Sequence, residues 1–431
     1  MKHWLFLLSL CATSLFAQTY PEVHPRIGQT LTAKDGSISV TLVDKFQNFS
    51  TSAAEPQPDA DIHSPKSANI HPRGKKFYIN SLEGCKTIAY DMVSRRKLAV
   101  VEHNFTEADT ALFLEQHELF PFRFYTENLH TFQGKPVEGA FSHGGRYFWV
   151  PFYRRTFDLN AQEPSAMAVI DTEKDSIVVV LETGPLPKMV CPSHDGRWMV
   201  VTHWGDNTVG VINIQSPHPR DWKYEHLFVI DKKLDLNFGL DMQVDRDDDS
   251  GWCLRGTVFT PDDRYLLVGC MGQGGGIAVI DMQTKQYLGR MQGMRANVRH
   301  LVIRDGWLYL SINRAGYVQR IRLDRFLDAA HHFNNHLATV TGWQECKVGA
   351  GARTIELSPD GRYVFAACNM DSRLDIVDTQ SMRLVLSVPA DSYTVGLDIS
   401  QDGRTVITTS QGRGTRGGNC VDVFHVDYSQ P

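Results

Sequence analysis

The chain has 431 residues, of which 42% are hydrophobic and 22% are charged, and its formal net charge is −5. These values are those of an ordinary globular protein. They disfavour a nucleic-acid binder that works by neutralising phosphates, because such proteins usually carry a net basic domain. The length exceeds that of most single domains, but a repeat architecture can reach it within one domain.

The first 17 residues predict a secretory signal peptide. The apolar stretch 4–16 is too short to cross a bilayer, and Ala17 is the expected cleavage site. A lipoprotein anchored at Cys11 is the weaker alternative, because Leu10 is larger than the residue that lipoprotein processing prefers. The sequence therefore predicts an exported chain of residues 18–431, periplasmic or secreted, without a transmembrane segment.

An eight-residue pattern occurs seven times in the chain. Its clearest copy is SPDGRYVF at 358–365, where Asp360 is expected to bond its own backbone and Gly361 to take the positive φ of a tight turn. The other copies begin at His71, Ser142, Ser193, Thr260, Ile303 and Ser400. We call the second residue of each octet its anchor. The shortest gaps between anchors are 42 and 43 residues, which matches the ~40 to 45 residues of a four-stranded propeller blade.

Strand patterns surround each octet. An apolar run precedes the turn, and segments rich in Val and Ile follow it, such as AMAVIDTEK from Ala166 and GIAVIDMQT from Gly276. The pattern predicts an all-β fold, a seven-bladed β-propeller with four-stranded antiparallel blades. The last repeat ends soon after its third strand, so we expect the unassigned strand pattern at 37–46 to pair with it and close the ring.

The repeats resemble the YVTN-type β-propeller repeat family. The resemblance is best in VVTHWGDNTVGVINI, residues 200–214, and in the segment 358–380, and it extends over most of residues 66–431. The name-giving tetrapeptide is absent, and His203 and Trp204 stand where the family prefers small or amide residues. The resemblance implies a surface or periplasmic binding module. The wider fold includes lactonases and the haem-carrying domain of periplasmic nitrite reductases, so the fold alone selects no activity.

Cationic residues recur at one position of the repeat, six residues before the anchor. The seven residues at this position are Lys66, Val137, Lys188, Arg255, Val298, Arg353 and Val395, and Arg299 and His300 follow directly in the fifth repeat. Innermost strands run along the propeller axis, so these positions predict a ring of positive charge at one mouth of the channel. Such a ring favours an anionic ligand.

The ring therefore predicts a binding site for an anionic small molecule, a glycan or a protein partner, formed by Lys66, Lys188, Arg255, Arg299, His300 and Arg353. The alternative is that these cations only form ion pairs with Glu138, Glu356 and Asp398, which also belong to inner strands.

Two long insertions, at about 104–136 and 217–254, separate neighbouring repeats. Both carry aromatic residues that either bind a partner or pack on the blades, and the first includes a predicted short helix. In the second, Asp245, Asp247 and Asp249 resemble the start of a calcium loop without its distal glutamate, so a solvated acidic loop is the alternative. His332 and His336 stand four apart in a predicted helix and are weaker metal candidates.

No sequence motif for catalysis is present, whether a nucleophile elbow, a zinc-protease motif or a P-loop. If the protein were a lactonase-like enzyme, Glu356, Asp398 and His300 would be the candidate acids and bases. If it bound a tetrapyrrole such as haem, His300 would be a candidate axial ligand. We expect neither, and predict a monomeric binding protein with no cofactor and no nucleic-acid partner. Cys270 and Cys368 are expected to be buried core thiols.

Overall fold

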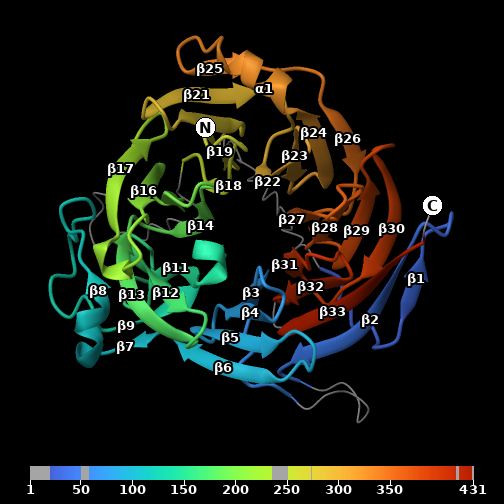
Figure 1. Ribbon diagram of the computed structural model, residues 1–431, viewed down its shortest axis with the longest axis horizontal. Coiled ribbons are helices and arrows are strands. Elements are labelled where there is room, and N and C mark those ends of the chain that lie inside the picture. The colour runs from blue at the N-terminus through green and yellow to red at the C-terminus, as the bar shows by residue number, and fades with distance from the viewer. Residues whose placement is uncertain (1–19, 50–57, 235–250, 273, 414–416, 430–431) are drawn as a thin grey trace, which may run out of the picture.

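The computed structural model describes residues 20–49, 58–234, 251–272, 274–413 and 417–429. The predicted signal peptide and the Asp245, Asp247 and Asp249 candidates lie outside these ranges. The protein is an all-β propeller, as predicted: the strands of the described ranges form seven sheets, which Figure 1 shows arranged as a ring around a central axis.

Four of the sheets have the predicted four antiparallel strands. In order from the axis outward they are β3 (Pro65–Ile70), β4 (Lys76–Ser81), β5 (Lys86–Asp91) and β6 (Lys97–Glu102); β14 (Pro187–Pro192), β15 (Trp198–His203), β16 (Thr208–Asn213) and β17 (Lys223–Val229); β22 (Val298–Arg304), β23 (Trp307–Ile312), β24 (Tyr317–Arg322) and β26 (Gln344–Lys347); and β27 (Ala352–Leu357), β28 (Tyr363–Cys368), β29 (Arg373–Asp378) and β30 (Arg383–Pro389).

Three sheets are larger, so the expectation of four antiparallel strands throughout is wrong for them. They comprise β18 (Leu254–Phe259), β19 (Tyr265–Cys270), β20 (Ile277–Asp281), β21 (Gln286–Gln292) and β25 (Leu337–Thr339); β7 (Asn104–Phe105), β8 (Phe113–Leu114), β9 (Phe132–Pro136), β10 (Ala140–Ser142), β11 (Tyr147–Arg155), β12 (Ser165–Asp171) and β13 (Ser176–Thr183); and β31 (Thr394–Ile399), β32 (Thr405–Ser410), β33 (Cys420–Tyr428), β2 (Ile38–Gln47) and β1 (Thr30–Thr32). The short strands β8 and β25 pair in parallel with β13 and β21. They cover outer edges that would otherwise present unpaired backbone groups.

The predicted ring closure is confirmed. β2 pairs antiparallel with β33 from Ile38 opposite Tyr428 to Gln47 opposite Cys420, and strands from the two ends of the chain therefore lie side by side in one sheet (Figure 1). This pairing joins the two ends of the ring and removes a free strand edge from the last repeat.

The octet turn forms as the sequence predicts. Asp360 Oδ1 accepts hydrogen bonds from the Ser358 hydroxyl at 2.5 Å and from the Arg362 backbone N–H at 3.0 Å. Gly361 has φ of 70°, a conformation that glycine adopts without steric cost. The same bonds hold the turn that begins at Ser400. The turn chemistry thus sets where each second strand begins.

Apolar side chains from neighbouring sheets form the core between them. Phe365 and Ile376 of one sheet share a buried cluster with Leu397 and Phe424 of the next. Each such side chain contributes ~1.5 to 3 kcal/mol when it is fully buried. Cys270 and Cys368 are fully buried as well, as expected for core thiols.

The described parts of both insertions pack on the ring. Phe105 and Phe132 of the first insertion are buried in one cluster with Phe152 of β11, and Trp222 of the second insertion stacks on Trp149 with ring centroids 5.0 Å apart. These aromatics therefore belong to the core and not to a partner surface.

The expected helices are shorter than the sequence suggested. The first insertion forms a 3-10 helix, η1 (Glu107–Leu112), and the other described helical segments are η2 (His143–Gly145), η3 (Pro219–Asp221) and α1 (Leu323–Ala330). Because α1 ends at Ala330, His332 and His336 do not share a helical face, and that prediction is wrong. His336 instead stacks on Tyr287.

We predict that a chain beginning at residue 60 loses cooperative unfolding and aggregates, because the edge of β33 is then left unpaired. Thermal unfolding and size-exclusion chromatography, compared with a chain beginning at residue 18, measure this. Identical behaviour of the two chains would show that the β2–β33 pairing does not hold the ring together.

Candidate functional site

The cations predicted from the repeat register come together in one pocket. The starts of the inner strands β3, β14, β18 and β27 surround a space of about 480 Å³, which we call the mouth pocket. Its cationic lining residues are Lys66, Arg154, Lys188, Arg255, Arg299, Arg353 and Arg413. Glu83 is the one carboxylate among the described residues that line it, and its carboxylate pairs with the Lys135 ammonium at 2.7 Å.

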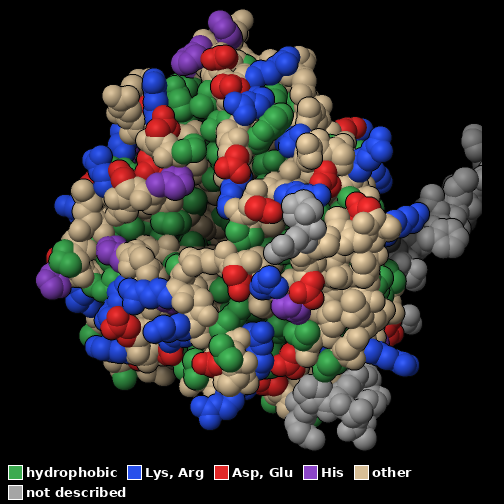
Figure 2. Space-filling model, turned by 45° about the vertical axis from the view of Figure 1, so that its right-hand side comes forward, with side chains coloured by type: hydrophobic (Ala, Val, Ile, Leu, Met, Phe, Trp, Pro, Cys, Tyr) green, Lys and Arg blue, Asp and Glu red, His purple; other side chains and the backbone are tan. Residues whose placement is uncertain are grey.

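The local packing of inner strands brings these side chains together. Gly256 follows Arg255 on β18, and a Cβ at this position would lie 2.7 Å from the Cα of His300 on β22. The absence of a side chain therefore lets the two inner strands approach closely, which sets Arg255 beside Arg299. Figure 2 shows one face of the ring, hollowed near its centre, with Lys, Arg, Asp and Glu side chains interspersed around the hollow.

A smaller space, which we call the inner cavity, adjoins the mouth pocket. It measures about 100 Å³ and shares the lining residues Lys66, Arg255, Arg299 and Arg353 with the mouth pocket. Its lining also includes Glu138, His300 and Glu356. The four shared cations thus form a layer between the two spaces.

Glu138 is the carboxylate that faces this layer. Its oxygens lie 3.6 Å from Arg255 Nη1 and 3.5 Å from Arg353 Nη2. Burial alone would raise the pKa of Glu138, but the surrounding cations outweigh burial and lower the pKa to about 2. The alternative of ion pairing is therefore correct in part, because one carboxylate pairs with two of the four cations.

Burial and mutual repulsion disfavour the charged forms of the cations in this layer. Burial, together with Arg353, Arg255 and Arg299, holds the pKa of Lys66 well below its ordinary value. Burial and neighbouring cations likewise lower the pKa of Arg299, and that of Arg353 to about 10. The Nε atoms of Arg255 and Arg353 are buried without a hydrogen-bond partner, whereas Arg255 Nη1 and Arg353 Nη2 face Glu138 at ion-pair distance. Buried donors without a partner favour an added acceptor.

Aromatic rings position several cations of the mouth pocket. The Lys188 ammonium lies 4.1 Å from the Tyr153 ring centroid and 4.9 Å from that of Trp204, and Arg413 lies 5.0 Å from the centroid of Tyr393. Such contacts stabilise a cation without neutralising it.

Sequence reasoning missed a second set of lining residues, which includes Tyr153, Trp204 and Gln411. Each stands ten residues after its anchor, within two residues of the end of a second strand. The signal was present in the repeat. Second strands run antiparallel to inner strands, as the pairing of Pro187 with His203 shows, so their ends reach the same mouth.

The three candidate acids and bases lie on inner strands, and His300 and Glu356 line the inner cavity. Two of the three, His300 and Asp398, link neighbouring sheets. His300 Nδ1 lies 3.0 Å from the backbone oxygen of Ile355, and Asp398 Oδ2 accepts the backbone N–H of Ile70 at 2.5 Å. Burial lowers the pKa of His300 to about 4. These contacts give His300 and Asp398 structural roles.

The tetrapyrrole alternative fits the site poorly. His300 lines the inner cavity of about 100 Å³ and is not among the residues that line the mouth pocket. A macrocycle in the wider space would not have this imidazole on its wall.

Glu356 and Asp398 are half-buried carboxyl groups on the neighbouring inner strands β27 and β31. Burial and the neighbouring Asp398 raise the pKa of Glu356 well above its usual value, and burial raises the pKa of Asp398 to about 7. Neither group pairs with the cation layer in the way that the ion-pair alternative requires.

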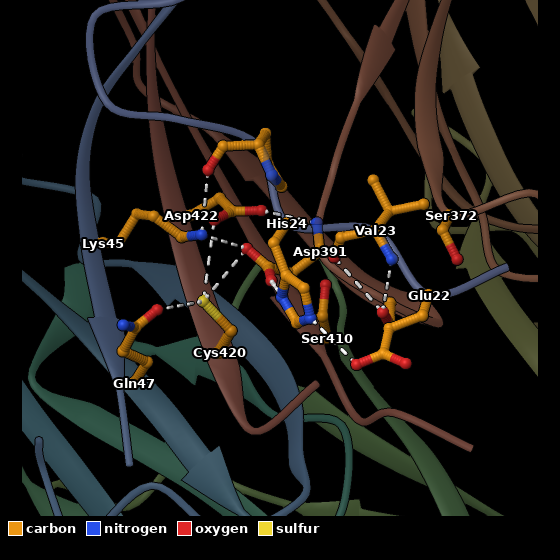
Figure 3. A network of polar contacts seen from close by, with 12 residues as sticks. Glu22, Val23, His24, Lys45, Gln47, Ser372, Asp391, Ser410, Cys420 and Asp422 are labelled. Carbon is orange, nitrogen blue, oxygen red and sulfur yellow. Dashed lines mark hydrogen bonds and ion pairs between the residues drawn. The ribbon is translucent and has the colours of Figure 1, made fainter. Parts of the chain in front are cut away.

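A separate acidic cluster lies where the ring closes. Asp391, Asp422 and Cys420 have potential ligand atoms within 4.8 Å of one another. Lys45 of β2 already provides a cation there, with its ammonium 2.7 Å from Asp391 Oδ2 and 3.0 Å from the backbone oxygen of Pro25 (Figure 3). Burial alone would lower the pKa of Lys45, but the facing acidic groups raise it. This network is therefore an internal ion cluster that fastens the N-terminal segment.

No protein-family model matches the sequence, and no curated protein matches it in sequence either. Solved structures match in fold. A Kuenenia stuttgartiensis hydrazine synthase chain superposes with a TM-score of 0.61 at 12% identity, covering 88% of this chain and 100% of its own. The β-propeller domain of Myceliophteria thermophila Cps50 (Swd1) superposes with a TM-score of 0.57 at 10% identity, covering 85% of this chain and 97% of its own. These similarities support the propeller fold alone.

Within the described ranges, no helix has both the length and the apolar character needed to cross a bilayer.

We predict that Lys45→Met lowers the free energy of unfolding by ~3 to 5 kcal/mol, because it leaves buried carboxylates without their cation. Denaturant titration measures the change, and Lys34→Met at an exposed position is the matched control. Equal stability of the two variants would contradict the role of the cluster.

We predict that Glu356→Gln stabilises the protein at pH 8, by roughly 1–3 kcal/mol, and changes little at pH 4. Both carboxyl groups bind protons more tightly in the folded protein than in the unfolded chain. The folded protein therefore loses stability as the pH rises from about 4 through about 7. The variant removes one charge of the pair. Unfolding curves at both pH values test this, and a variant that is less stable at pH 8 would contradict it.

Proposed function

We propose that this protein is an exported, non-catalytic binding protein whose mouth pocket recognises an anionic ligand. The observation that carries the proposal is the lining of that pocket, where the described residues include seven cations and one carboxylate, that of Glu83. In this proposal each of the seven sheets is one blade, and the site lies where the blades meet.

The charge balance favours binding over simple ion pairing. Glu83 is paired with Lys135, and Glu138 faces Arg255 and Arg353 from the inner cavity. Neither carboxylate pairs with Lys66 or Arg299 in these contacts. Cations that line a pocket with walls of low dielectric constant raise the local concentration of anions. The low dielectric constant also strengthens the attraction between the anions and these cations.

The proposal includes no catalysed reaction because two of the three candidate residues are used elsewhere. His300 and Asp398 form contacts with the backbone of neighbouring sheets. Export and membership of the YVTN-type family remain predictions from the sequence, and both agree with a binding role outside the cytoplasm.

Charge reversal tests the site directly. We expect Lys188→Glu with Arg353→Glu to abolish binding of anions by the folded protein, since the change replaces two attractive charges by two repulsive ones. Isothermal titration calorimetry with tricarballylate and with pyrophosphate measures affinity. The control is Lys34→Glu with Arg383→Glu, which changes the net charge equally at exposed positions.

Circular dichroism and the melting temperature show whether each variant is folded. If charge reversal prevents folding, Lys188→Gln with Arg353→Gln replaces it and should weaken binding at least tenfold. Unchanged affinity in a folded variant would exclude the mouth pocket as the binding site.

A further inference from the structure

A second pocket lies between the sheet of β11–β13 and the sheet of β14–β17. It has a volume of about 420 Å³, and its described lining residues belong to the connections that follow β8, β11, β13, β15 and β17. We call it the loop pocket. The connections after β11, β13, β15 and β17 lie at the mouth end of these strands, but the loop pocket and the mouth pocket have no described lining residue in common.

Backbone hydrogen bonds join the connections around the loop pocket. The Gly205 N–H donates to the Pro185 oxygen at 3.1 Å, and the Leu234 N–H donates to the Asp206 oxygen at 3.0 Å. The Phe120 side chain, only 3% exposed, packs edge-on against neighbouring rings. The described walls are thus held in place, and a ligand would not have to order them on binding.

The walls of the loop pocket are mostly apolar. Six of the ten described lining residues are apolar, among them Phe120, Pro164 and Pro185. The polar ones are Arg123, Gln162, Asp206 and Lys233. Apolar walls with a few polar groups, in a volume of about 300 to 1,000 Å³, are typical of sites for small molecules.

Gln162 brings a hydrogen-bond acceptor without a partner to this pocket. Its exposed fraction is 4%, and its Oε1 atom is buried without a hydrogen-bond partner. The residue is fixed through its backbone, since its N–H donates to Asp158 Oδ1 at 2.9 Å. An unsatisfied buried acceptor is unfavourable, so this oxygen favours a donor from a molecule that enters the pocket.

Arg123 brings a hydrogen-bond donor in the same condition. Its Nη1 atom is buried without a hydrogen-bond partner, while its Nη2 atom donates to the backbone oxygen of Gln162 at 3.2 Å. Its guanidinium also lies over the Phe124 ring, with the central carbon 4.8 Å from the ring centroid. One donor and one acceptor, both unsatisfied, therefore belong to two residues in direct contact.

We propose that the loop pocket binds an uncharged small molecule that carries a carboxamide group on an aromatic or branched aliphatic body. The amide oxygen accepts a hydrogen bond from Arg123 Nη1, and the amide N–H donates to Gln162 Oε1. The body packs on apolar residues such as Phe120 and Pro185. This site is additional to the proposed anion site and does not depend on it.

Charged ligands match this pair of groups less well. A carboxylate would satisfy Arg123 but would bring a second acceptor towards Gln162 Oε1, and an ammonium group would satisfy Gln162 but face the guanidinium. The remaining charged lining residues, Asp206 and Lys233, are of opposite sign and favour neither kind of ion. A carboxamide presents an acceptor and a donor side by side, and so it can satisfy both groups at once.

The first experiment compares amides with the matched acids. Ligand-observed NMR titrations of a chain beginning at residue 18 measure affinity for benzamide, isovaleramide, benzoate, isovalerate and acetamide. We expect at least one of the two larger amides to bind at least tenfold more tightly than its matched carboxylate and than acetamide, which lacks the apolar body. Saturating tricarballylate should leave this affinity unchanged, because the two pockets have no described lining residue in common.

A variant of Gln162 predicts changes of opposite sign. Gln162→Met replaces an unsatisfied buried acceptor by an apolar side chain of similar length, so we expect a higher melting temperature and roughly tenfold weaker binding of the amide. A side chain that only supports the fold would give a lower melting temperature. Gln215→Met, at an exposed position, is the control and should change neither quantity. If Gln162→Met does not fold, the comparison of amides with acids on the unaltered protein decides alone.

Three results would overturn the inference. The first is that neither benzamide nor isovaleramide binds, or that their matched carboxylates bind as tightly. The second is equal affinity for the amide in the folded Gln162 and Gln215 variants. The third is loss of amide binding in the presence of tricarballylate, which would place the amide in the mouth pocket. None of these results would exclude the anion site, which is tested with other ligands.

Discussion

The convergence of inner strands on one axis is the constraint from which the candidate site follows. Inner strands are the parts of the sheets nearest the axis, and all of them begin at the same mouth. Residues at one position of the repeat, separated by dozens of residues in sequence, therefore become neighbours in space. A cation that would be unremarkable on a single strand becomes part of a cluster when the same position is cationic in several repeats, as for Lys66, Lys188, Arg255 and Arg353.

The electrostatic cost of this cluster has to be offset elsewhere in the fold. Like charges in a poorly solvated channel repel one another, and the lowered pKa of Lys66 reflects that repulsion together with burial. Apolar clusters between the sheets and the β2–β33 pairing hold the strands in place regardless. Glu138 compensates in part, and the rings of Tyr153 and Trp204 stabilise Lys188 without neutralising it. Sites that depart from the best local stability are commonly functional.

Local and repeated features were predictable from the sequence, and single long-range contacts were not. The Asp360–Gly361 turn depends on residues within one octet, and the convergence of Arg255 with Arg353 depends only on counting from an anchor. By contrast, the ion cluster of Lys45, Asp391 and Asp422 joins residues from opposite ends of the chain.

The same distinction applies within the candidate site. His300 and Asp398 look like acid–base residues in the sequence, but each contacts the backbone of a neighbouring inner strand. A sequence shows which residues can donate or accept a hydrogen bond, and it does not show which backbone group lies opposite. The residues ten positions after an anchor were within reach of the repeat argument, because an antiparallel second strand returns to the mouth at which the inner strand began.

The charged groups of the channel also differ along its axis, and this difference limits how deep an anion can enter the site. Arg353 lies near the start of β27 and lines both spaces, whereas Glu356, three residues further along the same strand, lines only the inner cavity. Glu356 and its neighbour Asp398 form a carboxyl pair with raised pKa values. Beyond the cation layer, an entering anion would meet carboxyl groups that repel it when ionised and offer no compensating charge when protonated. In the proposed binding function, the cations and the carboxyl pair together would therefore stop an anion at the depth of Arg255 and Arg353, where a binding protein would retain its ligand and a channel would have to release it.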